Sequence, residues 1–389
     1  ALEAEAARFQ GSLDLANGPL LRIVLFGMGE GQAPRLLLVA HHLVIDAVSW
    51  RILLEDLLTA YGQLAQGIPV GLGLKTTSFK EWSERLSAMA ASEETLAALP
   101  VWRAVAERGA GGLPVDLDPG AAGPDDARSA ASVRVALTEA ESDALLHRAA
   151  RGLRAQPHEL LLAALGGALE EWTGHPATLV EVEGHGREAI FDDVDLSRTV
   201  GWFTSMHPVP LPGWAGAEPA AAVASVRDLL RDLRPHALAY GLLRHLGDGA
   251  ARAALAGIAP SVSFNYIGQL DQSGAVEAGL RVAPESPGPM RPEDAPRTHP
   301  LEVVGAVGDG RFFATFGYSR SRHRPETIER LAEAFVARLR LLVAGGSEAG
   351  STDLRADFPL AGLDEEELRD LIADLDALDL TQAGAAEGP

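Results

Sequence analysis

The sequence predicts an α/β fold of layered sheets and helices, and three observations carry this prediction. Short apolar runs rich in Val, Ile and Leu recur along the chain and are typical of strands. Amphipathic stretches with apolar residues at helical spacing separate these runs. The 389 residues are 47% hydrophobic, which is enough for a large core and for two to three domains. Strands that alternate with helices of this length indicate sheets covered by helices.

The first predicted elements are a strand pair and two helices. Residues 20–26 and 35–40 are apolar runs joined by a Gly-rich turn, which favours a hairpin. Residues 49–66 carry apolar side chains at helical spacing. Ser78 and Glu81 have the spacing of a capping box, so we expect a second helix to begin there.

A second unit is predicted after a linker at 109–132 that is rich in Gly, Pro, Asp and Ala. Its predicted elements are a strand at 132–137, a helix after a Thr138–Glu141 capping box, a helix at 158–172, a strand at 177–184, a helix at 218–233, a strand at 261–268, a hairpin over 301–318 turning on Asp309-Gly310, and a long helix at 325–343.

These elements divide the chain into two lobes and a tail. We predict an N-terminal lobe at 1–130, a C-terminal lobe at 131–345, and an acidic linker or tail at 346–389. Leucines within the tail predict a short acidic helix near 368–375, followed by disordered residues.

Charge and composition exclude several function classes. The formal net charge of −21 argues against a nucleic-acid partner and against an anionic membrane surface. There is no cysteine, so disulfides, thiolate metal sites and a cysteine nucleophile are excluded. No HExxH motif or three-ligand metal pattern occurs, and no apolar run has membrane-spanning length. We therefore expect a cytoplasmic protein with no metal site.

The stretch HHLVIDAVSW at residues 41–50 is the most informative motif. Two adjacent histidines end an apolar strand pattern, and histidine can exchange a proton near neutral pH. A metal-binding or core histidine pair is the alternative. Asp46 stands at the turn into a helix, where we expect it to bind backbone donors or an arginine and to be structural. His41 and His42 face opposite sides, and the pattern alone does not decide which one is structural.

Three further segments combine polar residues with turns or strand ends. Glu183 ends a strand before Gly-His-Gly, whose glycines leave room for a close approach; it is a candidate acid or base, or else a surface glutamate. Trp202 belongs to a predicted packed loop wall. Asn265 and Tyr266 are polar residues within a strand, which indicates either satisfied hydrogen bonds or a site.

Together and in this order, these segments resemble the epimerization domains of nonribosomal peptide synthetases, which belong to the condensation-domain superfamily. The resemblance runs from about residue 8 to residue 345. It is carried by HHLVIDAVSWRILLEDL at 41–57, LKTTSFKEWSERL at 74–86, EGHGRE at 183–188, RTVGWFTS at 198–205, AYGLLRHL at 239–246 and FNYIGQLD at 264–271.

The resemblance implies two chloramphenicol-acetyltransferase-like lobes in a V-shaped pseudo-dimer, with a tunnel between them. A peptidyl carrier protein, upstream in the same synthetase, would insert its 4'-phosphopantetheine arm, so the domain would need no cofactor of its own. Neighbouring synthetase domains are the other implied partners. The Cα proton of the thioester-bound aminoacyl or peptidyl group would be removed and returned on the opposite face, L to D.

The resemblance also implies the roles of individual residues. His42 and Glu183 would be the catalytic pair, one from each lobe on opposite sides of Cα. Asn265 or Tyr266 would donate a hydrogen bond to the enolate. The supporting and channel residues would be His41, Asp46, Ser49, Trp50, His185, Arg187, Trp202, Tyr240, Asn265 and Tyr266.

The chain departs from the family pattern at three places. Ala47 stands where the family often has glycine, and residues 236–239 lack the glycines expected there. The family's opening motif is absent, so we expect an N-terminally truncated domain with part of its first-lobe core exposed. Two alternatives stay open: a condensation domain, which needs the histidines but no acid at Glu183, and a catalytically silent scaffold that docks carrier proteins.

Overall fold

The computed structural model describes residues 1–109, 111–118, 123–270 and 281–349. The predicted helix near 368–375 and the residues after it lie outside this part of the chain. Within it, the helices are α1 (Leu2–Gln10), α2 (Ala47–Ala65), α3 (Phe79–Met89), α4 (Glu93–Ala97), α5 (Leu99–Arg108), α6 (Glu139–Asp143), α7 (Ala150–Gly152), α8 (Pro157–Thr173), α9 (Pro219–Leu233), α10 (Ala237–Gly241), α11 (Gly249–Leu255) and α13 (Pro325–Ala349), with 3-10 or π turns η1 (His42–Val44), η2 (Ala127–Ser129), η3 (Ala144–Ala149), η4 (Arg234–His236) and η5 (Leu242–Leu246).

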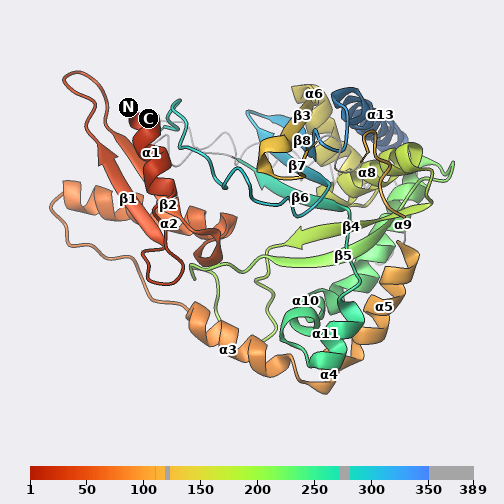
Figure 1. Cartoon of the computed structure of the whole chain (residues 1–389), viewed down its shortest axis with the longest axis horizontal. Helices are drawn as coiled ribbons and strands as arrows, with labels where there is room; N and C mark the ends of the chain where they lie inside the picture. The colour runs from red at the N-terminus through yellow and green to blue at the C-terminus, as the bar shows by residue number, and fades with distance from the viewer. Residues whose placement is uncertain (110, 119–122, 271–280, 350–389) are drawn as a thin grey trace, which may run out of the picture.

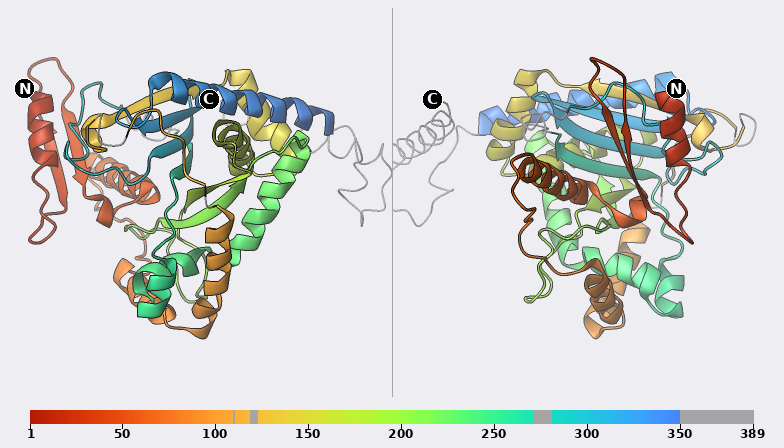
Figure 2. Two further views of the ribbon diagram at one scale, coloured as in Figure 1. Left: turned by 45° about the vertical axis from the view of Figure 1, so that its right-hand side comes forward. Right: turned by 90° about the vertical axis from the view of Figure 1, so that its left-hand side faces the viewer.

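The predicted N-terminal hairpin forms a two-stranded antiparallel sheet, β1 (Leu21–Phe26) with β2 (Arg35–Ala40). Together with α1 and α2 it stands to one side of the larger sheet (Figures 1 and 2). Alternate residues of β1 are exposed, among them Ile23 at 63% and Leu25 at 69%. One face of this hairpin is therefore apolar and open in the structure.

The second sheet has six strands in the order β3-β8-β7-β6-β4-β5. The strands are β3 (Ala130–Ala136), β4 (Ala177–Gly184), β5 (Ser205–Pro212), β6 (Val262–Gln269), β7 (Leu301–Gly308) and β8 (Arg311–Ser319). The pairs β4–β6 and β6–β7 are parallel, and the other pairs are antiparallel. Asp309 and Gly310 both have positive φ at the β7–β8 turn, as the Asp-Gly pair predicts.

Strand β5 was not predicted from the sequence. Its residues include Pro208, Pro210 and Pro212, and proline interrupts a sheet ladder because it has no N–H. The structure places β5 at the edge of the sheet, where proline is tolerated. The three prolines alternate, so their missing donors all lie along one edge of the strand.

The main core lies between this sheet and helices α8 and α13. Helix α8 is buried on every side from Leu160 to Leu169, which explains its almost uninterrupted apolar sequence. Gly166 allows the end of β5 to come close, because a Cβ there would lie 2.2 Å from the carbonyl oxygen of Pro212. Helix α13 crosses the outer side of this layer (Figure 2).

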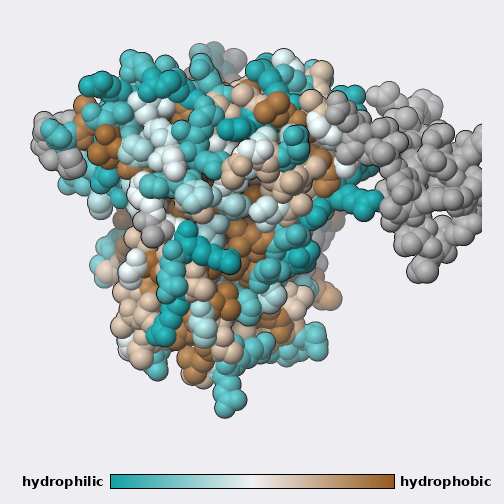
Figure 3. Space-filling view, turned by 90° about the vertical axis from the view of Figure 1, so that its right-hand side faces the viewer, coloured by the Kyte–Doolittle hydropathy of each residue, from teal (hydrophilic) through white to brown (hydrophobic). Residues whose placement is uncertain are grey.

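A second core cluster is built from helices α5, α10, α11 and η5 against β4 and β5. Trp102 of α5 is fully buried there and packs 5.0 Å from the ring of Tyr240. Residues of α5 thus share a core with the C-terminal residues although they precede residue 130. Seen from the side of α5 and α9, hydrophilic residues cover much of the upper surface, and apolar residues gather among hydrophilic ones toward the middle and the lower half (Figure 3).

The two predicted capping boxes differ in the structure. Thr138 and Glu141 form both reciprocal hydrogen bonds. Ser78 caps α3 by accepting from the N–H of Glu81 at 3.1 Å. The Glu81 carboxylate instead accepts from Arg85 at 3.0 Å, one helical turn along, so this box is only half formed.

Candidate active site

The two histidines differ in their surroundings. The N–H of His41 donates to the carbonyl oxygen of Leu20 at 2.9 Å, and its ring Nδ1 accepts from the N–H of Leu43 at 3.2 Å. His41 therefore caps the short turn η1. His42 is exposed, and its ring centroid lies 6.0 Å from that of Trp202 in an edge-on arrangement. His42 is thus the histidine whose ring is free of such a capping bond.

Asp46 is almost fully buried, with 4% of its surface exposed, and it joins α2 to the loop before β5. Its carboxylate accepts from the N–H of Ser49 at 2.7 Å, from the N–H of Phe203 at 3.1 Å and from the Arg187 guanidinium at 3.3 Å. Ser49 donates to the carbonyl oxygen of Gly201 and accepts from its N–H. Asp46 thus has both kinds of partner expected of it, backbone donors and an arginine.

Arg187 completes this arrangement, which we call the clasp (Asp46, Ser49, Arg187, Gly201 and Phe203). Its guanidinium donates to the carbonyl oxygens of Leu196 at 2.7 Å and Thr199 at 2.9 Å, and lies 3.9 Å over the Phe203 ring. Burial by itself raises the pKa of Asp46, but the hydrogen bonds from Ser49 and Phe203 and the charge of Arg187 outweigh it. The pKa of Asp46 therefore lies below its ordinary value.

The turn after β4 brings Arg187 into the clasp. Gly186 has φ +66°, and a Cβ there would lie 1.6 Å from the carbonyl oxygen of Phe203, so only glycine fits. The N–H of Arg187 donates to Nδ1 of the exposed His185 at 2.9 Å. The glycines of the Gly-His-Gly segment therefore permit a close chain approach.

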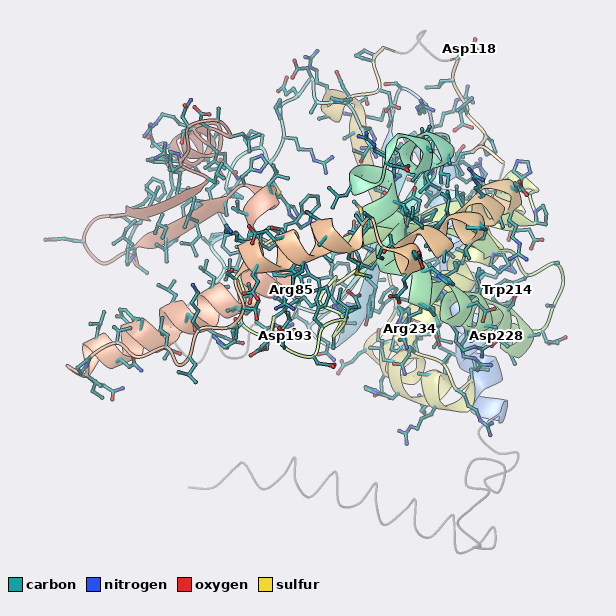
Figure 4. All side chains as sticks on the ribbon, turned by 90° about the horizontal axis from the view of Figure 1, so that it is seen from below. Arg85, Asp118, Asp193, Trp214, Asp228 and Arg234 are labelled. Carbon is teal, nitrogen blue, oxygen red and sulfur yellow. The ribbon has the colours of Figure 1, made fainter. Side chains whose placement is uncertain are left out.

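The loop between β4 and β5 is also attached to α3. The guanidinium of Arg85 contacts the carboxylate of Asp193 at 2.6 Å, and the two labelled side chains lie next to each other in the view from below (Figure 4). Trp82 and Phe203 belong to a small buried cluster at the same place. These contacts hold the loop that carries Arg187 and Trp202.

Glu183 lies on β4, beside Asn265 of the parallel strand β6. The register pairs Val182 with Phe264, so the next residue on each strand is also adjacent. The amide of Asn265 donates to the Glu183 carboxylate at 2.5 Å. Burial, and then the charge of Glu181, raise the pKa of Glu183, while His42 acts in the opposite direction. A positive charge on His42 therefore favours the ionised form of the Glu183 carboxyl.

The remaining predicted site residues lie at different depths. Trp50 is half-buried in the first turn of α2, and Trp202 is 36% exposed beside His42. Tyr266 alternates with Asn265 along β6 and packs against the main core. Tyr240 is only 2% exposed, and its hydroxyl accepts from Arg244 at 3.2 Å, so it is a core residue of the second cluster.

Two residues near Glu183 were missed by the sequence reasoning. Glu181 shares the strand face of Glu183, and the alternation in VEVEG was a signal that could have indicated it. His299 contacts Glu181 from the segment before β7, and only the strand order brings it there.

Among the described residues, no group of three or more His, Asp or Glu side chains has the arrangement of a metal site. No helix of that part of the chain is both long and apolar enough to cross a membrane.

Comparisons with known proteins agree with the family that these motifs resemble. The family model of the condensation domain matches residues 1–354. The chain belongs to the condensation-domain family. It is 42% identical over 379 residues to chondramide synthase cmdD of Chondromyces crocatus, and 32% identical over 382 residues to tyrocidine synthase 1 of Brevibacillus parabrevis. These matches cover 96% and 95% of the chain but only 9% and 35% of the two synthases.

Solved structures confirm the predicted fold. The epimerization domain from the third module of tyrocidine synthetase B superposes with a TM-score of 0.80 at 30% identity, covering 90% of this chain and 78% of that one. The first condensation domain of the calcium-dependent antibiotic synthetase shares the fold at a TM-score of 0.59 and 20% identity, covering 90% and 76%. The α/β class and the chloramphenicol-acetyltransferase-like architecture are therefore confirmed. The assignment to the condensation superfamily of nonribosomal peptide synthetases is confirmed too.

Proposed function

We propose that the chain epimerizes the Cα of an aminoacyl or peptidyl group held as a thioester on a carrier protein, within nonribosomal peptide synthesis. In synthetases of this family the phosphopantetheine arm is carried on the partner carrier protein, so the proton transfers fall to the domain's own side chains. Inversion needs one group to remove the Cα proton on one face and another to deliver a proton on the other face. The thioester makes the Cα proton more acidic. A general acid or base increases the rate of such a proton transfer by about 10²–10⁴-fold.

The observation that carries this proposal is the environment of Glu183. Its carboxyl is largely buried, is held by the Asn265 amide, and has a raised pKa from burial. A carboxyl of this kind can hold a proton closer to neutral pH than an exposed one. His42 belongs to the turn η1 that follows β2, the second strand of the other sheet, and acts electrostatically on the same carboxyl. The two groups are therefore suited to opposite sides of one substrate.

A condensation activity is the second candidate, because the matching family model is that of the condensation domain. Amide formation would use His42 but would give no role to the raised pKa of Glu183. The relation to an epimerization domain at 30% identity supports the first proposal over this one.

One experiment separates the candidates. A carrier protein loaded with an L-aminoacyl or peptidyl thioester is incubated with the chain in D₂O, with and without a second carrier that bears an acceptor amine. Epimerization incorporates deuterium at Cα and yields the D isomer. Condensation forms an amide only when the acceptor is present. If neither product forms while the carrier binds, the chain is a docking scaffold and the proposal is wrong.

A further inference from the structure

Glu183 has a second carboxylate beside it on the same strand. Glu181 lies two residues earlier on β4, and alternate residues of a strand share a face. Its carboxylate is largely buried and lies 3.1 Å from Nε2 of His299, with side-chain exposures of 17% and 13% respectively. When the His299 ring is protonated the two groups form an ion pair, and a pair this poorly solvated is screened much less than a surface pair.

His299 contacts the two residues that precede it as well as Glu181. It lies two residues before Leu301, the first residue of β7, and β7 is separated from β4 by β6, so its ring reaches across the start of β6. Its Nδ1 lies 3.3 Å from the Thr298 hydroxyl, and its carbonyl oxygen accepts from Arg297 at 3.4 Å. The ring therefore presents Nε2 to Glu181 and Nδ1 away from it.

The charged and titratable groups around Glu183 come from several elements. Glu181 on its own strand raises the pKa of Glu183 after burial does, while His42 of η1 and His299 lower it. The titratable groups that face Glu181 from β5 and α10 are His207 and Tyr240.

Neither of these two groups balances the charge of Glu181. Burial lowers the pKa of His207 to about 4, so its ring is neutral near pH 7. Burial likewise raises the pKa of Tyr240, whose neutral hydroxyl carries no positive charge. Of the described groups on this face, His299 is the one that ion-pairs with Glu181.

We propose that Glu181 and His299 are positioning residues that together control when the Glu183 carboxyl carries its proton; this rests on the proposed function. The negative charge of Glu181 disfavours ionisation of Glu183 on the same strand face. The positive charge of His299, paired with Glu181, weakens this repulsion. Because Glu183 must act as acid in one direction and as base in the other, the pair sets the pH range over which both directions run.

The test is the titration of Glu183 itself, in the full chain and without substrate. Carbon-13 NMR of chain labelled at glutamate carboxyls follows the titration, and Glu183→Gln assigns its signal. Glu181→Gln removes a negative neighbour, so the titration midpoint of Glu183 is expected to move to lower pH. His299→Gln removes the counter-charge of Glu181, so the midpoint is expected to move to higher pH. The pH profile of inversion should follow each shift.

Opposite shifts are what a merely structural pair would not produce. Glu181→Asp keeps the charge and is expected to keep the midpoint, which separates charge from packing. Glu171→Gln, at an exposed position on α8 paired with Arg338, controls for the loss of one negative charge elsewhere. If the midpoint of Glu183 shifts in the same direction in both variants, or in neither, the proposed roles of Glu181 and His299 are wrong. The titration needs no turnover. A chain that does not epimerize therefore refutes the proposed function, while the titration still tests the roles of Glu181 and His299. If Glu181→Gln does not fold, the shift in His299→Gln alone tests those roles.

Discussion

At the scale of single residues, the candidate site contains groups that hold the backbone and groups that make few hydrogen bonds. His41 caps a turn, and Asp46 accepts from two backbone N–H groups and an arginine. His42 makes no such bond, and the Glu183 carboxyl is held only by the Asn265 amide among the described residues. Neighbouring positions in one motif therefore have different expected roles.

Replacement of the two histidines should separate these roles. We expect His42→Ala to lower the rate of inversion by about 10²–10⁴-fold, because a general acid–base group is lost. We expect His41→Ala to lower the free energy of unfolding by about 1 kcal/mol through the lost capping bond, with a smaller effect on rate. Inversion assays and denaturant unfolding of both variants measure this. Near-normal inversion by a folded His42→Ala chain would contradict the assignment.

The Asp46 carboxylate should stabilise the fold in a pH-dependent way. Its pKa is depressed in the folded state, so its contribution is present above the unfolded-state pKa and is lost as pH falls through the folded-state value. Removal of one partner of a buried ion pair leaves the charge of the other uncompensated. Asp46→Asn should therefore lower the free energy of unfolding by about 3 kcal/mol near neutral pH. It should cost less in acid, where wild type has lost the same contribution.

Thermal unfolding of Asp46→Asn across this pH range, together with activity, checks the expectation. Asp56→Asn is the matched control, since Asp56 lies on the same helix and pairs with Arg198 in a more exposed position. A surface pair of that kind contributes only about 0–1 kcal/mol. Loss of activity by Asp46→Asn without loss of stability would place Asp46 in the chemistry instead.

At the scale of elements, sequence patterns predicted those strands and helices whose residues obey local rules. The strands β1, β2, β4 and β6 and the β7–β8 hairpin occur where periodicity and turn residues indicated. Strand β5 could not be predicted, because its three prolines are acceptable only at a sheet edge, and the edge is decided by the whole topology. The contact of Arg187 with Asp46 spans 141 residues, and no local pattern encodes it.

The turn after β4 gives a prediction at this scale. Gly186→Ala should unfold or displace the turn, because it adds both a strained positive φ and a Cβ 1.6 Å from a carbonyl oxygen. Gly216→Ala is the control, with φ +77° and no atom within 4 Å of the added Cβ, so it carries only the backbone cost of about 1–2 kcal/mol. Unfolding midpoints of the two variants are compared. Equal losses of stability in the two variants would show that the close approach to Phe203 does not add to the cost of Gly186→Ala.

At the scale of the whole molecule, the clasp connects the N-terminal sheet and α2 to the loop between β4 and β5. His42 follows the end of β2, Glu183 is the next-to-last residue of β4, and His42 acts electrostatically on the Glu183 carboxyl. The sequence indicated the two motifs and, through the alternation in VEVEG, could have indicated Glu181, whereas His299 is brought to Glu181 by the strand order.

Removal of metal ions should not affect the reaction. The proposed proton transfers use a histidine and a carboxyl, and the described residues form no metal-ligand cluster. Inversion of a preloaded carrier-bound substrate is therefore expected to keep its rate after exhaustive chelation. Activity that is lost on chelation and restored by a divalent ion would require a different mechanism.

The two-sided arrangement makes a prediction that a single acid–base group does not. One group serving both faces would have to move around Cα, whereas His42 of η1 and Glu183 of β4 are two groups on separate elements and need no such motion. Each group then acts as base for one isomer and as acid for the other. Glu183→Gln keeps the shape of the side chain and removes its proton transfer, so inversion should collapse from both isomers.

Deuterium exchange at Cα reveals which half-reaction survives in Glu183→Gln. The isomer whose Cα proton faces His42 can still lose it and regain a deuteron on the same face, so exchange with retention should persist from that isomer. The other isomer should show neither exchange nor inversion. His42→Ala should give the reverse pattern, which makes the two variants controls for each other. Full inversion from both isomers in Glu183→Gln would remove Glu183 from the mechanism, and His42 would then work with another partner.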